Sequence, residues 1–173
     1  AVIGDFAETP RYQGAGSSSV NATRVDNLKD AAEADDITLA GFCAGYERSG
    51  TPNPAFVEEA AALARKADVV VLCMGLDESS ASEGLDRSHI CIPDNQKQLL
   101  EAVAQANENL VVVLSAGSVV ETGWVSRCKA VLHAYLGGQA GAAAIMDVLN
   151  GRVNPTGQLD TTLALPSAAT PPA

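Results

Sequence analysis

Apolar and polar segments alternate along the chain in a way that predicts strands and helices in turn. The runs at 69–74 and 110–114 are continuously apolar, as is typical of parallel strands that are covered on both faces. Shorter apolar segments predict the remaining strands, at 2–4, 37–42, 130–135 and, as an added edge strand, 158–163. We therefore expect a sheet of five to six strands.

Helices are expected between these strands, where apolar residues recur at spacings of three and four. Asn53 and Pro54 predict an N-cap followed by the first helical residue. Thr23, with Asp26 three residues later, is close to a capping box and predicts another helix start. The later helices are expected over 54–66, 94–106 and 138–149. Strands that alternate with helices imply a three-layer α/β sandwich, Rossmann-like, with a mostly parallel sheet and right-handed crossovers.

The length of 173 residues is that of one domain with a sizeable core. Apolar residues make up 47% of the chain and aromatic residues only 4%, which suits a sheet covered by closely packed helices. We expect the domain to span residues 1–163. The proline-containing segment 164–173 is expected to be a linker or tail.

The chain carries a formal net charge of −10, which argues against a nucleic-acid partner because an acidic surface repels phosphates. It contains no apolar run of 18 residues, so no membrane-spanning segment is expected. Its four cysteines form no CxxC pair and its two histidines are far apart, so neither a metal site nor a cofactor is expected. Reduced thiols favour a cytoplasmic protein, although secretion and one disulfide stay open.

Functional residues are expected in the loops at the carboxyl ends of the strands, as in other alternating α/β proteins. The loop 5–22 contains Gly14-Ala15-Gly16-Ser17-Ser18-Ser19, which by itself resembles a phosphate-binding turn. In a dinucleotide fingerprint the glycines lie directly between strand and helix. Here they lie ten residues past Gly4, and the next helix is expected only near Thr23. A nucleotide-binding doubly wound domain therefore stays an alternative only.

The loop 76–93 concentrates charge, with four carboxylates and one arginine between residues 76 and 87. One interpretation is a solvated acidic loop in which Asp86 and Arg87 form a surface ion pair of little energetic value. The other is that Glu83 is a proton donor. A carboxylic acid can protonate a leaving oxygen at neutral pH if burial or a nearby negative charge raises its pKa. Gly84 would let the backbone turn closely around it.

These motifs occur together with several others in one order and spacing, at 1–4, 12–18, 75–78, 82–87, 92–96, 111–114, 117–121, 138–141, 147–151 and 154–159. In that arrangement the sequence resembles the second, α/β-sandwich domain of glycoside hydrolase family 3, the β-glucosidase and β-xylosidase group. The resemblance covers nearly the whole chain. It implies that a barrel domain, absent from these residues, is the partner and supplies a nucleophilic aspartate.

By this resemblance Glu83 is the acid/base residue, because it is the glutamate of a Glu-Gly-x-Asp-Arg motif. Many relatives carry another glutamate where this chain has Ala81, and Glu78 is the reserve candidate. The resemblance also places the loop 5–22 beside the sugar. The substrate-binding candidates, in that loop and in the motif, are Arg11, Tyr12, Ser17, Ser18, Asp86 and Arg87. The alternative is that the residues of loop 5–22 only shape a contact between domains.

Trp124 follows a strand and is either a platform for a sugar ring or, more commonly for a single tryptophan, a packing residue. Taken together, the resemblance implies a domain of a retaining, exo-acting β-glucosidase or β-xylosidase. Because the barrel is missing, we expect the 173 residues alone to be inactive. A non-catalytic module that binds sugar or stabilises a partner domain is the second alternative.

Overall fold

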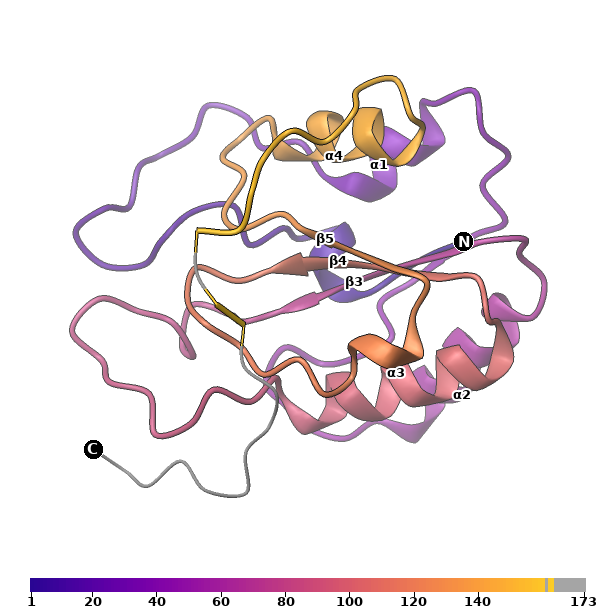
Figure 1. The fold of residues 1–173 in the computed structure, drawn as a ribbon, viewed down its shortest axis with the longest axis horizontal. Coiled ribbons are helices and arrows are strands. Elements are labelled where there is room, and N and C mark those ends of the chain that lie inside the picture. Colours follow the sequence, from indigo (N-terminus) through magenta and orange to yellow (C-terminus); the bar gives the residue numbers. More distant parts are fainter. Residues whose placement is uncertain (161, 164–173) are drawn as a thin grey trace.

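A parallel sheet with helices on both faces forms the centre of the molecule (Figure 1). The computed structural model describes residues 1–160 and 162–163. Within them the sheet has five strands in the order β2-β1-β3-β4-β5, and every neighbouring pair is parallel. The strands are β1 (Val2–Ile3), β2 (Phe42–Cys43), β3 (Val70–Gly75), β4 (Leu110–Ser115) and β5 (Ala130–His133). The predicted three-layer α/β sandwich is confirmed.

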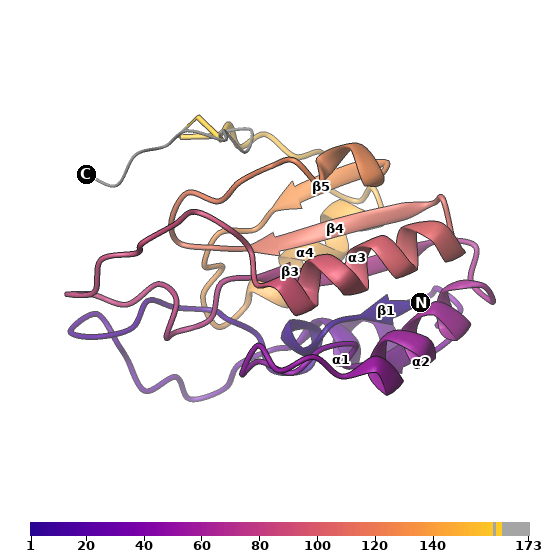
Figure 2. The ribbon, with the colours of Figure 1, turned by 90° about the horizontal axis from the view of Figure 1, so that it is seen from below.

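Two helices cover each face of the sheet. Helices α1 (Leu28–Glu33) and α4 (Gly141–Leu149) lie together on one face, above the strands in Figure 1. Helices α2 (Pro54–Ala64) and α3 (Asp94–Ala106) lie together on the other face and stand in front of the strands in Figure 2. Two short 3-10 turns, η1 (Asp5–Ala7) and η2 (Val125–Arg127), complete the described elements.

The continuous apolar runs of β3 and β4 have a direct structural cause. Successive side chains of a strand point to opposite faces of the sheet. Leu72 and Met74 belong to the core cluster that includes residues of α2 and α3, while Cys73 belongs to the cluster that includes residues of α1 and α4. Both faces of β3 therefore need apolar side chains, and the same holds for Val112 and Val113 of β4.

Helix starts follow the local capping chemistry. Asn53 caps α2 by accepting from the amide of Phe56, with Pro54 as the first helical residue, which confirms that prediction. The expected start of α1 near Thr23 was wrong. The cap is Asn27, whose side-chain oxygen accepts from the Asp30 amide at 2.8 Å, so the helix begins at Leu28.

Three further boundaries differ from the prediction. The strand expected at 37–42 is reduced to β2, because this edge strand pairs with only the two residues of β1. Helix α4 begins at Gly141, not 138, since the chain first turns at Gly138, where φ is +71°. No strand is assigned at 158–160 or 162–163, and residue 161 and the expected tail 164–173 lie outside the described residues.

Candidate active site

The long loops that follow the strands lie at the carboxyl edge of the sheet, on the left of Figure 1. The backbone at the root of one of them is packed very closely. Gly75, the last residue of β3, has a φ of +152°, and a Cβ atom there would lie 1.9 Å from the carbonyl oxygen of Ser115. Only glycine lets the ends of β3 and β4 approach in this way. The loop 76–93 therefore starts from a fixed point.

A short turn organises the beginning of this loop. Asp77 accepts from the amide of Ser80 at 2.7 Å and from the hydroxyl of Ser79 at 3.0 Å, and its carbonyl accepts from the Ala81 amide. Partial burial raises the pKa of Asp77, but the hydrogen bonds from Ser80 and Ser79 outweigh burial and hold that pKa below its ordinary value. Asp77 is therefore a structural carboxylate of the turn.

Glu83 lies exposed at the loop edge, against the glycine- and serine-rich loop. Its Oε2 atom accepts from the backbone amide of Ser17 at 2.8 Å and from the Ser17 hydroxyl. Its own amide donates to the carbonyl of Ala15 at 3.4 Å. The Ser17 hydroxyl and then the Ser17 amide lower the pKa of Glu83 below its ordinary value. Figure 1 shows the two loops side by side at this edge.

Gly16 explains why this contact is possible. Its φ is +95°, and a Cβ atom there would lie 2.8 Å from both Cβ and Oε2 of Glu83. The missing side chain leaves the space that the carboxylate occupies. The glycine-rich loop therefore holds a glutamate and opens no helix, since α1 begins only at Leu28. A nucleotide fingerprint needs the glycines directly before the helix, so no observation supports that alternative.

Arg11 is buried beneath the two loops, with its side chain only 1% exposed. Its Nε donates to the carbonyl of Gln13 at 2.7 Å and its Nη2 to the carbonyl of Ala81 at 2.9 Å. Nε also lies 3.8 Å from Oε1 of Glu78. The polar contacts of Arg11 are thus with other residues of these two loops.

Glu78, the reserve candidate, is surrounded by different chemistry from Glu83. Its carboxylate lies 3.8 Å from a guanidinium nitrogen of Arg11 and 3.8 Å from one of Arg48. Arg48 in turn binds the carboxylate of Asp5. None of the ion pairs in the described part of the chain includes Glu83. Arg48 was not among the predicted site residues, although it lies in a loop after a strand, where functional residues were expected.

Tyr12, Ser17 and Ser18 lie in the loop that contacts Glu83. The Tyr12 hydroxyl accepts from the side-chain amide of Gln13 at 2.9 Å, and its backbone carbonyl accepts from Gly138. Ser17 and Ser18 are exposed, and Ser17 binds Glu83. The structure therefore brings Ser17 and Glu83 together, with Tyr12 in the same loop.

Arg87 turns away from its neighbour in the motif. Its Nη1 donates to the carbonyl of Val119 at 2.7 Å and to the Ser118 hydroxyl at 3.2 Å, and its Nη2 donates to the carbonyl of Cys91 at 3.3 Å. No ion pair among the described residues joins it to the exposed Asp86, so the interpretation as a surface ion pair was wrong. Arg87 connects the loop after β3 to the loop after β4, because its guanidinium nitrogens donate to backbone carbonyls and not to the Asp86 carboxylate.

Trp124 is a packing residue. It is 5% exposed within the core, and its indole nitrogen donates to the carbonyl of Glu121 at 2.8 Å. The platform alternative was therefore wrong.

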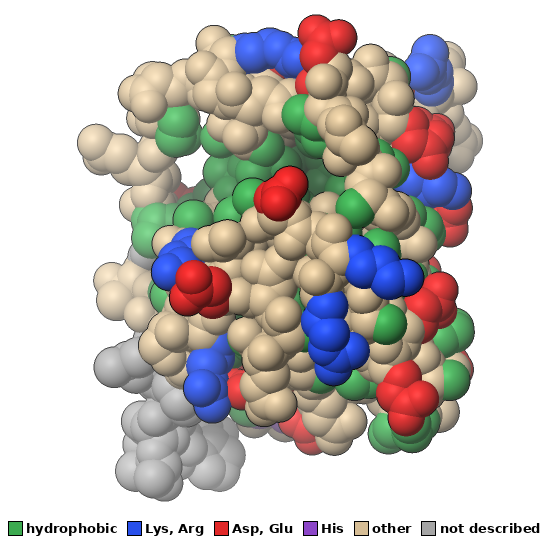
Figure 3. Space-filling view, turned by 90° about the vertical axis from the view of Figure 1, so that its right-hand side faces the viewer, with side chains coloured by type: hydrophobic (Ala, Val, Ile, Leu, Met, Phe, Trp, Pro, Cys, Tyr) green, Lys and Arg blue, Asp and Glu red, His purple; other side chains and the backbone are tan. Residues whose placement is uncertain are grey.

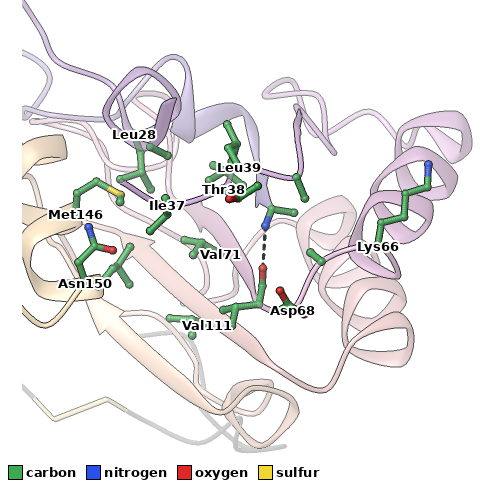
Figure 4. Close-up of a pocket in the computed structure, with 17 residues that line it drawn as sticks. Leu28, Ile37, Thr38, Leu39, Lys66, Asp68, Val71, Val111, Met146 and Asn150 are labelled. Atoms are coloured by element: carbon green, nitrogen blue, oxygen red, sulfur yellow. Dashed lines mark hydrogen bonds between the residues drawn. The ribbon is translucent and has the colours of Figure 1, made fainter. Parts of the chain in front are cut away.

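A hollow lies at the opposite edge of the sheet, beside the amino ends of the strands. It measures about 620 Å³ and is lined mainly by apolar side chains, among them Leu28, Val71, Val111 and Met146. Figure 3 shows it as an apolar depression, and Figure 4 shows Lys66 and Asp68 at its rim. None of the candidate site residues lines it. At the loop edge a smaller hollow of about 220 Å³ is lined by residues that include Asp86 and Arg87.

The four cysteines are free thiols. Over residues 1–160 and 162–163, no three histidine, cysteine or acidic side chains are grouped as metal ligands. In the same residues no helix combines the length and apolarity that crossing a membrane requires.

A comparison with known families decides the identity. Residues 1–172 match the model of the glycosyl hydrolase family 3 C-terminal domain. The chain belongs to this family. It is 46% identical over 167 residues to the thermostable β-glucosidase B of Acetivibrio thermocellus, covering 94% of the chain, and 44% identical to an exo-α-(1→6)-L-arabinopyranosidase of Bifidobacterium breve, covering 95%.

A solved structure gives the same result for the fold of this family 3 domain. The crystal structure of the Bifidobacterium adolescentis family 3 β-glucosidase superimposes on 88% of the chain with a TM-score of 0.83, at 43% identity. The chain spans 22% of the length of each of these three relatives. It is therefore one domain of a much larger type of enzyme.

Proposed function

We propose that this chain is the domain of a retaining, exo-acting β-glycosidase that supplies the acid/base residue, Glu83. The supporting observation is the position of Glu83. Its carboxylate is exposed at the carboxyl edge of the sheet and rests on two hydrogen-bond donors of Ser17, free of the ion pairs that engage Glu78. Membership of a glycoside hydrolase family gives this geometry its chemical meaning.

The reaction needs a second carboxylate, which we assign to an aspartate of a barrel domain in the parent chain. The aspartate attacks the anomeric carbon while Glu83 gives its proton to the departing glycosidic oxygen. Glu83 then takes a proton from water, whose oxygen displaces the aspartate and restores both carboxyl groups. Retention requires the two carboxyl groups about 5–5.5 Å apart, so the loop edge has to face the barrel closely.

The surroundings of Glu83 in this chain favour its ionised form, because the hydrogen bonds from Ser17 lower its pKa. A general acid needs the opposite shift. Removal of water and a neighbouring negative aspartate both raise the pKa of a carboxyl group. Docking of the barrel supplies both effects, so proton donation depends on the interface. For this reason the 173-residue chain alone has no substantial hydrolytic activity.

The sugar is bound between the two domains in this proposal. Tyr12, Ser17, Ser18 and Asp86 offer polar groups near or at the loop surface, while Arg11 and Arg87 bind backbone carbonyls below it. The named relatives comprise a β-glucosidase and an arabinopyranosidase. Aryl β-D-glucoside, β-D-xyloside and α-L-arabinopyranoside are therefore the first substrates to compare in the parent enzyme.

The test is Glu83→Ala in the parent enzyme, with Glu78→Ala as its control. Glu83→Ala is expected to lower kcat/KM for a phenyl glycoside by about 10²–10⁴-fold, the usual contribution of general acid catalysis. A 2,4-dinitrophenyl glycoside needs little protonation and is expected to lose far less. Azide needs no base to attack the glycosyl-enzyme, so it is expected to restore turnover and to release a glycosyl azide.

The opposite pattern would reject the assignment. If Glu78→Ala shows the leaving-group dependence and azide rescue, Glu78 is the acid/base residue. If neither variant changes turnover while the protein stays folded, the domain is a non-catalytic module that binds sugar or stabilises its neighbour.

A further inference from the structure

Arg11 is the one arginine or lysine among the described residues whose whole residue is buried, at 3% exposure. A guanidinium loses much of its favourable hydration when it leaves water, so burial has to be offset by good contacts. The Arg11 guanidinium donates hydrogen bonds to two backbone carbonyls and lies 3.8 Å from the carboxylate of Glu78. Its Nη1 atom is fully buried and has no hydrogen-bond partner. An unpaired buried donor is uncommon in folded proteins and lowers the stability that Arg11 can contribute.

The two carbonyls belong to two different loops. The Gln13 carbonyl is in the loop that also contains Ala15 and Ser17, the two residues that bind Glu83. That of Ala81 lies two residues before Glu83 itself. The guanidinium is a rigid fork whose donors point in fixed directions, so it sets the spacing between two acceptors. Arg11 therefore joins the two loops at their base.

The same loops are joined again at their tip. The amide of Glu83 donates to Ala15, and the carboxylate of Glu83 accepts from Ser17. With a link at the base and another at the tip, each loop limits the movement of the other. The direction of the Glu83 side chain thus depends on a residue that does not reach the surface.

We propose that Arg11 is the positioning residue of the acid/base glutamate: it fixes the separation of the two loops and thereby the place from which Glu83 transfers its proton. This rests on the proposed role of Glu83. Arg11 touches neither substrate nor reacting atoms in this account. A displacement of about 1 Å in such a site costs on the order of 10²-fold in rate.

The test uses the parent enzyme with Arg11→Met, Arg11→Lys and, as a matched control, Arg24→Met. Arg24 lies between the loop 5–22 and α1, and its side chain is 86% exposed and pairs only with Asp26 in the ion pairs of the described residues. For each variant, kcat/KM is measured on a phenyl and a 2,4-dinitrophenyl glycoside with one preparation. The ratio of the two values is then independent of the amount of folded enzyme.

Arg11→Met is expected to lose about 100-fold on the phenyl glycoside and to stay within about threefold on the dinitrophenyl glycoside, because only the former needs the proton. Arg11→Lys keeps the charge, but one ammonium cannot reproduce the fork, so an intermediate loss with the same preference is expected. Arg24→Met is expected to leave both values unchanged.

If Arg11→Met and Arg11→Lys lose kcat/KM equally on both substrates, Arg11 has a merely structural role and the proposal is overturned. The proposal is also overturned if neither variant loses kcat/KM. If Arg11→Met does not fold, the ratio for Arg11→Lys decides. Glu83→Ala is measured in parallel. If Glu83→Ala shows no leaving-group dependence, the proposed function fails. If Glu83→Ala shows this dependence and the Arg11 variants do not, only the proposed role of Arg11 fails.

Discussion

At the carboxyl ends of the strands, polar groups connect one loop to the next, whereas at the amino ends apolar side chains line an open groove of about 620 Å³. The loop edge contains Glu83, Ser17 and the buried Arg11. The groove edge contains exposed apolar residues such as Ile37 and Val69, at 46% and 47% exposure. Figures 1 and 3 show these opposite sides of the molecule.

The groove is larger than the hollow beside Asp86 and Arg87, and it lies away from the candidate site residues. A catalytic carboxyl group needs donors, acceptors and a fixed direction, and the loop edge supplies these beside a smaller hollow of about 220 Å³. The groove has volume but offers mainly aliphatic contacts. The candidate site lies at the carboxyl ends of the parallel strands, where sites are expected in open α/β sheets.

The largest expected effect is on the root of the loop edge. Gly75→Ala would place a Cβ atom 1.9 Å from the Ser115 carbonyl oxygen at a φ of +152°, so the ends of β3 and β4 would have to separate. We expect a loss of about 3 kcal/mol or more in the free energy of unfolding, measured by urea denaturation of the chain.

Gly84→Ala is the matched control for Gly75→Ala. Gly84 also has a positive φ, +78°, but a Cβ atom there meets nothing within 4 Å. Only the strain of the left-handed conformation applies, and the expected cost is about 1 kcal/mol. Equal losses at the two glycines would contradict a tightly packed root at β3.

A smaller effect is expected on the ionisation of Glu83. Because Ser17 lowers the pKa of Glu83, Ser17→Ala should raise it toward the ordinary value, although not fully, since the backbone amide stays. A carboxyl pKa that is lowered by folding stabilises the protein above the unfolded pKa, and this contribution is lost as the pH falls through the folded pKa. Wild type should therefore lose slightly more stability than Ser17→Ala on acidification.

NMR titration of the Glu83 side-chain carboxyl in the chain measures this shift directly. Ser18→Ala is the control, because Ser18 is exposed in the same loop and Ser17 makes the contacts with Glu83. An unchanged Glu83 pKa in Ser17→Ala would mean that the two loops do not hold each other in solution, and would weaken the contrast between the edges.

The smallest effect is expected at the groove edge. Val69→Ser replaces a side chain that is 47% exposed and lies beside the groove. We expect the free energy of unfolding of the chain to change by no more than about 0.5 kcal/mol in urea denaturation. A loss above about 1 kcal/mol would show that this rim packs more firmly than its exposure indicates.

Much of the fold was predictable from local patterns. The apolar runs of β3 and β4 are unambiguous because both faces of these strands are covered, and Asn53-Pro54 marks a helix start through its own side chain and ring. The prediction failed where two signals compete locally. Thr23 and Asn27 are both plausible caps, and only the packing of Leu28 against the sheet favours the second.

The site was predictable in part. Position after a strand and the motif around Glu83 located the loop edge, but the partners of long side chains were not readable from the chain. One interpretation paired Arg87 with Asp86, but Arg87 binds the Val119 carbonyl in the loop after β4 and the Cys91 carbonyl in its own loop. The burial of Arg11, at 3% exposure, and its hydrogen bond to Ala81 were likewise not readable from the sequence. A guanidinium reaches several residues in any direction, so its partner depends on the assembled fold.

The sequence alone predicted the layers, the direction of the strands and the edge on which the candidate site residues lie, because periodicity, capping and loop order act over a few residues. The tertiary structure decided which groups meet at that edge: a glutamate on a serine of another loop, and an arginine between them and the core. Such contacts join residues 66 to 70 positions apart, and only the packing of strands and helices brings them within hydrogen-bond distance.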